Sequence, residues 1–169
     1  MKIVAVLLLF SLLSSCWPTS VSFKDKGSMP ESWKTFSIKT LEINAANCPL
    51  SYSAALTEKL KDGIQNNTRL ALNTRLGKGE VNIEGLISSY NVMPLAIQGN
   101  DNASQNRLTI SVQFSIFVSE PKEDIINLTA TRFADFNAST NLSTVESQLV
   151  DEISEQIVQD VINKLLSNW

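Results

Sequence analysis

The sequence predicts an α+β fold, a two-layer sandwich in which two helices pack on one face of a four-stranded, mostly antiparallel sheet (β-α-β-β-β-α). Residues 81–118 hold two alternating apolar–polar runs around a long loop, the pattern of an antiparallel hairpin. Shorter runs at 33–43 and 125–136 predict one strand before it and one after it. Residues 51–67, and those from 143 almost to the C-terminus, repeat apolar residues every three or four positions, as amphipathic helices do.

The N-terminus predicts a secretion signal followed by a lipid anchor. One basic residue precedes a short apolar run at residues 3–13, which is too short to span a bilayer comfortably. Leu13-Ser14-Ser15-Cys16 then has the form of a bacterial lipobox. In that class the signal is cut before the cysteine, which is acylated on its sulfur and then usually on its new amine, and two or three acyl chains anchor a protein stably. The alternative is an ordinary secretory signal that happens to contain a cysteine.

We therefore divide the chain into a lipoprotein signal peptide (1–15), a lipidated tether (16–32) and a single α/β domain (33–169). Prolines, a glycine, serines and charges in the tether region favour a linker. The hydrophobic content of 43% is ordinary for a globular domain. Because Lys2 is the only charged residue in the signal, its removal changes the formal charge from −3 to −4. A mildly acidic chain is not expected to bind nucleic acid.

No catalytic, metal or cofactor site is expected. The chain has no histidine, which removes the commonest general base and metal ligand and excludes a Ser-His-Asp nucleophile. Asp151, Glu152 and Glu155 could mimic paired carboxylates, but a solvated helix face is the favoured interpretation. If Cys16 is lipidated, Cys48 is a quiet thiol; if Cys16 kept its thiol, a Cys16–Cys48 disulfide is the alternative.

The first strand and helix are each expected to bury one side. Between 33 and 43 the apolar residues change parity after residue 38, which suggests a bulge. Ser51 or Ser53 can cap the first helix, which runs to about Asn67. Residues 70–72 form either a short strand or the end of that helix. The apolar stripe of the helix consists of Tyr52, Leu56, Leu60 and Ile64.

The hairpin at 81–118 is the element around which the fold is organised. Its second run places six residues on the buried face: Leu108, Ile110, Val112, Phe114, Ile116 and Val118. In its first run the parity changes after Gly85, which predicts a bulge or twist there.

The long loop of this hairpin is a candidate contact for a partner or a lipid. Its start is apolar at Met93, Leu95 and Ile97, and Arg107 stands at its far end, where it could meet an acidic headgroup or a carboxylate. The alternative is that Leu95 and Ile97 fold back on the sheet edge and Arg107 pairs with a local acid such as Asp101.

The last strand leads into a long helix. Ser143 and Glu146 have the spacing of a capping box. Five apolar residues then step by four: Leu149, Ile153, Ile157, Val161 and Leu165. This helix is expected to cover the sheet, with Phe114 and Ile157 meeting between the two layers.

Several segments together resemble the LptE-type lipopolysaccharide-assembly lipoproteins, in the form found in Bacteroidota. They are the lipobox at 13–16, residues 36–38, 94–100 leading into 106–110, 132–136, 142–146 and the terminal Asn168-Trp169. The resemblance implies an outer-membrane lipoprotein that faces the periplasm. It implies that the protein plugs an LptD-type β-barrel, helps the barrel to fold and aids lipopolysaccharide insertion. It also implies a fold of two helices on a four-stranded sheet, and Cys16 is the residue that it assigns.

Two other classes of function remain open from the sequence. One is an auxiliary periplasmic lipoprotein of a lipid-moving ABC transporter, built on a similar scaffold. The other is an enzyme that acts on envelope glycans, which the missing histidine and the lack of a convincing carboxylate pair disfavour.

Overall fold

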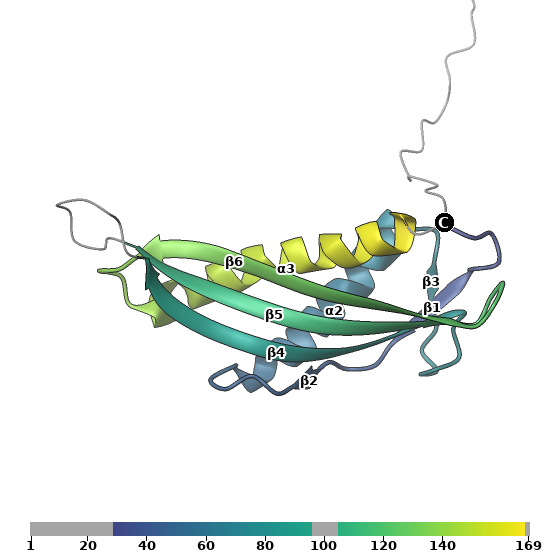
Figure 1. The fold of residues 1–169 in the computed structure, drawn as a ribbon, viewed down its shortest axis with the longest axis horizontal. Coiled ribbons are helices and arrows are strands. Elements are labelled where there is room, and N and C mark those ends of the chain that lie inside the picture. Colours follow the sequence, from purple (N-terminus) through teal and green to yellow (C-terminus); the bar gives the residue numbers. More distant parts are fainter. Residues whose placement is uncertain (1–28, 96–104, 168–169) are drawn as a thin grey trace, which may run out of the picture.

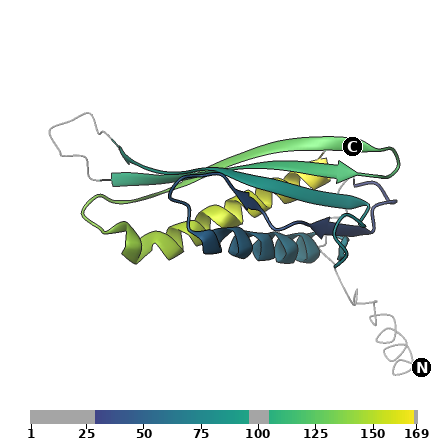
Figure 2. The same cartoon turned by 90° about the horizontal axis from the view of Figure 1, so that it is seen from below.

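Three long antiparallel strands form the body of the sheet: β4 (Val81–Leu95), β5 (Gln105–Val118) and β6 (Asp124–Asn137). The computed structural model, which describes residues 29–95 and 105–167, pairs them along almost their whole length (Figure 1). The helices α2 (Leu50–Asn67) and α3 (Leu142–Ser167) lie together on one face of this sheet (Figure 2). The predicted two-layer α+β arrangement is confirmed.

The predicted four-stranded sheet is wrong in detail, because the sheet has six strands and is mixed. Its order is β3-β1-β4-β5-β6, with β2 also paired to β4. The strands β1 (Thr35–Ile38) and β2 (Glu42–Ile43) run parallel to β4, and β3 (Ala71–Leu72) runs parallel to β1. A helical crossover returns the chain in the same direction, so the strands joined by α2 are parallel. Residues 70–72 thus include a short strand.

The segment predicted as one strand at 33–43 is split into β1 and β2, because side chains of α2 form hydrogen bonds with the backbone between them. Leu41 N–H donates to Thr57 Oγ1 at 3.1 Å, and Leu41 O accepts from Ser53 Oγ at 2.5 Å. Ser53 is therefore buried against Leu41 and does not cap the helix, which begins at Leu50 without a side-chain cap. Three residues lie between Ile38 and Glu42 where β4 has two between their partners, so the suggested extra residue is present.

The irregularity in β4 lies between Ile87 and Ser89, not at Gly85 as predicted. Gly85 stays paired with Phe114, and its lack of a side chain has another reason. A Cβ atom at Gly85 would lie 2.5 Å from Leu41 Cδ2 and 2.9 Å from a ring carbon of Phe114. Gly85 is therefore required by close packing above the sheet.

The core between the two layers follows the predicted periodicities. All six predicted inward residues of β5 are buried, and so are the apolar stripe of α2 and the five α3 residues that step by four. Phe114 and Ile157 both lie in this one core. The predicted capping box of α3 is wrong: Asn141 Oδ1 accepts from Ser143 N–H at 3.1 Å and from Ser143 Oγ at 3.0 Å, while Glu146 turns away to Tyr90.

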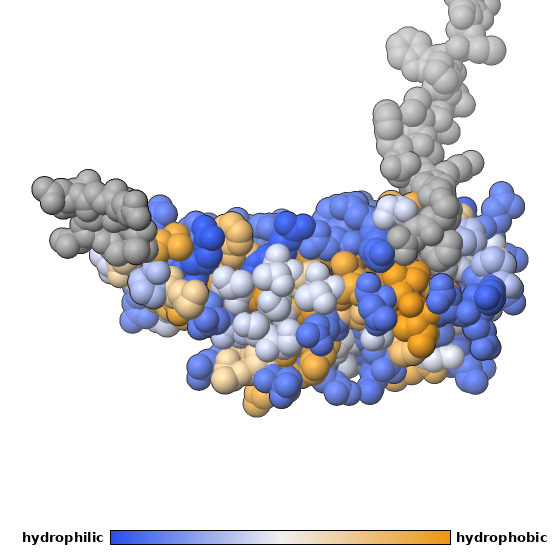
Figure 3. Space-filling model, in the orientation of Figure 1, coloured by the Kyte–Doolittle hydropathy of each residue, from blue (hydrophilic) through white to orange (hydrophobic). Residues whose placement is uncertain are grey.

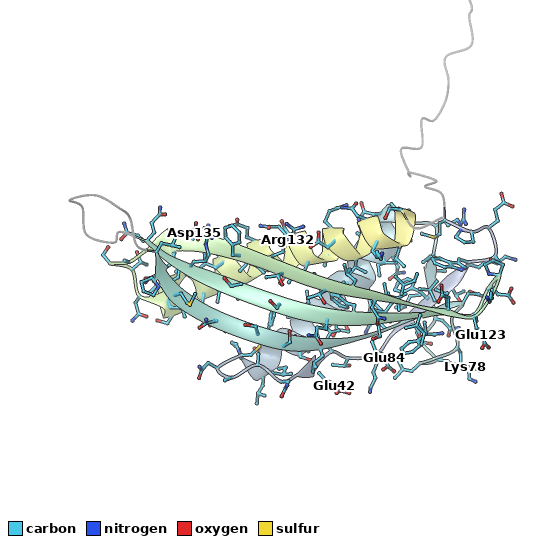
Figure 4. All side chains as sticks on the ribbon, in the orientation of Figure 1. Glu42, Lys78, Glu84, Glu123, Arg132 and Asp135 are labelled. Carbon is cyan, nitrogen blue, oxygen red and sulfur yellow. The ribbon has the colours of Figure 1, made fainter. Side chains whose placement is uncertain are left out.

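The strand β6 is one edge of the sheet, at the end of the strand order opposite β3. Arg132 occupies a core-facing position of this strand by parity, between the buried Ala130 and Ala134. Its side chain reaches to α3, where the guanidinium forms a two-point ion pair with Asp160, including an Nε–Oδ2 hydrogen bond of 2.7 Å. Figure 4 shows Arg132 at the upper edge of the sheet, beside α3.

Candidate functional site

The face of the sheet opposite the helices is the largest candidate surface, and we call it the open face. No described element covers it (Figure 2). Uncharged hydroxyl and amide groups dominate its middle, which forms a pale band in Figure 3. They come from the alternate positions of β5 and β6 that point away from the core: Thr109, Ser111, Gln113, Ser115, Asn127, Thr129 and Thr131.

These polar residues form rungs across the strands. Ser111 and Thr131 are register partners and their hydroxyls are 2.9 Å apart. Ser115 Oγ donates to Asn127 Oδ1 at 3.3 Å. Because these side chains are short and partly paired to one another, they present a flat surface of hydrogen-bonding groups without net charge. The sequence predicted this wetter face of β5 correctly.

One end of the open face, next to the loop of the hairpin, carries a cluster of Met93, Arg107, Phe133 and Asp135, which we call the hairpin-end cluster. Arg107 Nε and Nη2 donate to the two carboxylate oxygens of Asp135 at 2.7 and 2.9 Å. The guanidinium carbon lies 3.6 Å from the centre of the Phe133 ring, a cation–π contact. The side-chain hydrogen bonds from Arg107 hold the pKa of Asp135 below its usual value.

Three of the four predicted contact residues take defined places in this cluster or beside it. Met93 is the register partner of Arg107 and its side chain is 58% exposed, whereas Leu95 is half-buried. Ile97 lies outside the described residues, as does Asp101, the acid suggested for Arg107.

The sequence analysis missed Asp135 and Phe133. The acid that binds Arg107 is Asp135, on the neighbouring strand. Arg107 and Asp135 lie equally far from the turn at Pro121, so antiparallel pairing brings them opposite each other. Counting outward from that turn would have found the pair.

The other candidate groups are quiet. Cys16 lies outside the described residues. Burial, with a smaller contribution from Glu146, raises the pKa of the Cys48 thiol and makes it less reactive. Asp151, Glu152 and Glu155 are exposed on α3, and Asp151 pairs with Lys59 at 2.9 Å, which agrees with a solvated helix face.

Two tyrosines tie the layers together near this end of the fold. Tyr90 OH donates to Glu146 at 2.5 Å, and Ser154 Oγ donates to the Tyr52 hydroxyl at 3.2 Å. Burial raises the pKa of Tyr52 to about 12 and raises the pKa of Tyr90 as well, so both stay neutral at physiological pH. These groups link β4, α2 and α3 and are structural.

Residues 29–95 and 105–167 contain neither a cluster of metal ligands nor a membrane-spanning helix. There, no three His, Cys, Asp or Glu residues lie close enough together to hold a metal ion. No helix of the same part of the chain is both long and apolar enough to cross a bilayer.

A family model described as LptE, lipopolysaccharide-assembly, matches residues 38–165. No curated protein matches the sequence. Three solved structures share the fold. An uncharacterized lipoprotein B from Nitrosomonas europaea is 15% identical over 88% of this chain and 91% of its own, with a TM-score of 0.56. A hypothetical protein from Chlamydia trachomatis is 12% identical over 81% and 100% (TM-score 0.55), and a protein from Xanthomonas campestris is 11% identical over 87% and 91% (TM-score 0.53).

Proposed function

The chain belongs to the LptE family of lipopolysaccharide-assembly proteins, and from this premise we propose that it is a non-catalytic outer-membrane lipoprotein. In this proposal Cys16 carries the lipid anchor and the folded domain faces the periplasm. The domain docks in the lumen of an LptD-type β-barrel, supports its assembly, and aids the insertion of lipopolysaccharide.

The open face is the observation that supports docking in a barrel. The lumen wall of a large outer-membrane barrel is polar, so a plug needs a surface of matching hydrogen-bonding groups. In the middle of the open face β5 and β6 offer uncharged hydroxyl and amide groups, and Glu84 of β4, the register partner of Ser115, is a carboxylate beside them. The strand length makes this face roughly 45 Å long, which is comparable to the height of a barrel. A helix layer on the other side keeps it stiff.

We assign the hairpin-end cluster as the part of this surface that meets the barrel or the lipopolysaccharide first. Arg107 gives two N–H donors to Asp135, which leaves the remaining donors of its guanidinium for an acidic group. Met93 adds an exposed apolar side chain beside it, and the half-buried Leu95 ends β4 two residues further on. The cluster would act through oriented hydrogen bonds, since the ion pair has no net charge.

Site-specific photocrosslinking in cells tests this proposal. A photoreactive residue in place of Gln113, in the middle of the open face, should crosslink to an outer-membrane barrel. The same residue in place of Glu155, exposed on α3, is the matched control and should not. Capture of an inner-membrane ATPase complex from position 113 would instead favour the transporter lipoprotein. Equal crosslinking from both positions would contradict docking through the open face.

A further inference from the structure

The end of the open face away from the hairpin loop carries a pocket of a different chemical character. It has a volume of about 570 Å³, and its lining includes Phe117, Glu123, Asp124 and Ile125; we call it the turn-end pocket. Phe117 lies ten residues along β5 from Arg107, so the pocket is about 33 Å from the hairpin-end cluster. The two surfaces can therefore bind separate partners.

The floor of the turn-end pocket is apolar. Phe117 and Ile125 are register partners on β5 and β6, and their side chains are 37% and 54% exposed. Both point to the open face, where an orange patch lies over this end of the sheet in Figure 3. Two large apolar side chains that lie next to each other in solvent are typical of a contact surface.

The rim of the turn-end pocket is acidic. Within the described part of the chain neither Glu123 nor Asp124 has an ion-pair partner, although Asp124 Oδ1 accepts the N–H of Ile125 at 2.8 Å. Glu84 lies at the same end of the molecule (Figure 4). The nearby cations belong to loops: Lys122 lines a smaller neighbouring pocket, and Lys78 precedes β4.

The turn that carries this rim is fixed in place by the core. The indole N–H of Trp33, a fully buried side chain, donates to Glu120 O at 2.5 Å. Ser119 N–H donates to Glu80 O at 3.0 Å. A ligand would therefore meet a turn whose backbone is already positioned, which lowers the entropy cost of binding.

We propose that the turn-end pocket binds a short extended peptide segment of a partner protein, in which a lysine or arginine and a large apolar residue stand two positions apart. The apolar side chain would cover Phe117 and Ile125, and the cation would meet Glu123 and Asp124. An extended segment presents alternate side chains to opposite faces, so two residues that are two positions apart face the pocket together. This inference does not depend on docking in a barrel, and the assay below contains none.

Fluorescence polarisation tests the proposal with the full lipid-anchored chain in a nonionic detergent. The probe is a fluorescein-labelled peptide with blocked ends and the sequence lysine-serine-leucine-serine-lysine, and its counterpart has glutamate in place of both lysines. We expect saturable binding of the lysine peptide and much weaker binding of the glutamate peptide. Glu123→Gln with Asp124→Asn should weaken binding of the lysine peptide about tenfold, and Ile125→Ser should weaken this binding several-fold.

The matched control is Asp151→Asn with Glu152→Gln, which changes the net charge equally on the solvent face of α3 and should leave the affinity unchanged. Glu123→Lys, at an exposed side chain of the turn, should shift preference toward the glutamate peptide. Equal binding of both peptides, or an equal loss in the control, would overturn the proposal. A large gain in affinity after Lys24→Ser with Lys26→Ser would also overturn it, because the chain's own basic segment would then be the occupant.

Discussion

At the residue scale, the missing side chain of Gly63 determines how closely two helices can pack. It lies where α2 packs on α3, and a Cβ atom at this position would come within 2.3 Å of Val158 Cγ1. A valine in a helix has one strongly preferred rotamer, so Val158 cannot easily turn away. Close approach of the two helices therefore depends on this glycine.

We predict that Gly63→Ala lowers the free energy of unfolding by about 1–2 kcal/mol, because overpacking outweighs the intrinsic helix preference of alanine. Urea denaturation measures the change. Val158→Ala in the same chain should restore part of the loss, and Asp62→Ala, at an exposed position of α2, serves as the control. An increase in stability for Gly63→Ala would show that the helices separate without cost.

Phe114 and Phe117 give a second comparison at this scale, because they lie on opposite faces of β5. Phe114 is 2% exposed and Phe117 is 37% exposed. Phe114→Ala should lower the free energy of unfolding by about 3–5 kcal/mol, whereas Phe117→Ala should cost about 1 kcal/mol or less. Equal losses in denaturant titrations would contradict the assignment of the two faces.

At the scale of elements, long regular patterns were predictable and short non-local ones were not. The strands β5 and β6 follow from the sequence because one buried face imposes a period of two over 14 residues each. The split between β1 and β2 could not be predicted, since it depends on Ser53 and Thr57 reaching Leu41 from a helix. The start of α3 was misread for a similar reason, because Tyr90 removes Glu146 from the expected cap.

Glu80, which directly precedes β4, accepts two hydrogen bonds from Thr35 of the parallel strand β1. This contact predicts that the stability of the fold depends on pH. Glu80 Oε2 accepts from Thr35 Oγ1 at 2.7 Å and from Thr35 N–H at 2.6 Å, and these bonds hold the pKa of Glu80 below its usual value of 4.5. A carboxyl with a lowered folded-state pKa stabilises the fold above its unfolded pKa and loses this effect as the pH falls through the folded value. Glu80→Gln should therefore be less stable than the wild type at pH 7.

Thermal unfolding at several pH values measures this difference. The two proteins should approach each other below pH 4.5, where the wild-type carboxyl also becomes neutral. Glu84→Gln, at an exposed position of β4, is the control. A difference that stayed constant from pH 7 to acid would show that the charge of Glu80 contributes nothing.

At the scale of the whole molecule, the two ends of the open face differ in how far they could be predicted. The apolar start of the hairpin loop is visible in the sequence at Met93 and Leu95. The pairing of Arg107 with Asp135, and the meeting of Phe117 with Ile125, needed the register of β5 and β6. Short-range patterns find exposed strands, but only the register shows which residues share a surface.

Anchoring gives the first prediction for the whole protein. Cys16→Ala should accumulate as an unprocessed precursor, because the lipid-modifying reaction needs the thiol. Gel mobility and metabolic labelling with a fatty acid measure this, and Cys48→Ala is the control that should mature normally. An acylated protein of mature size from Cys16→Ala would contradict the lipobox.

The hairpin loop gives the second prediction for the whole protein. Leu95→Ser with Ile97→Ser should leave the isolated protein folded but weaken its capture of the barrel in a mild-detergent pull-down. Leu50→Ser, at an 87% exposed position on the helix layer, is the control. Loss of folding in the double variant would make the loop structural, and normal capture would exclude it as a docking site.

The ion pair between Arg132 and Asp160 has a consequence for the protein before it meets any partner. An unpaired strand of 14 residues at the rim of a sheet is a template for the same strand of another copy, and such stacking leads to fibrils. A second strand added along β6 would have to crowd this bonded guanidinium, because Arg132 stands near the middle of the rim and reaches across it to α3. The pair therefore disfavours edge-to-edge stacking of β6 in one copy of this chain on β6 in another.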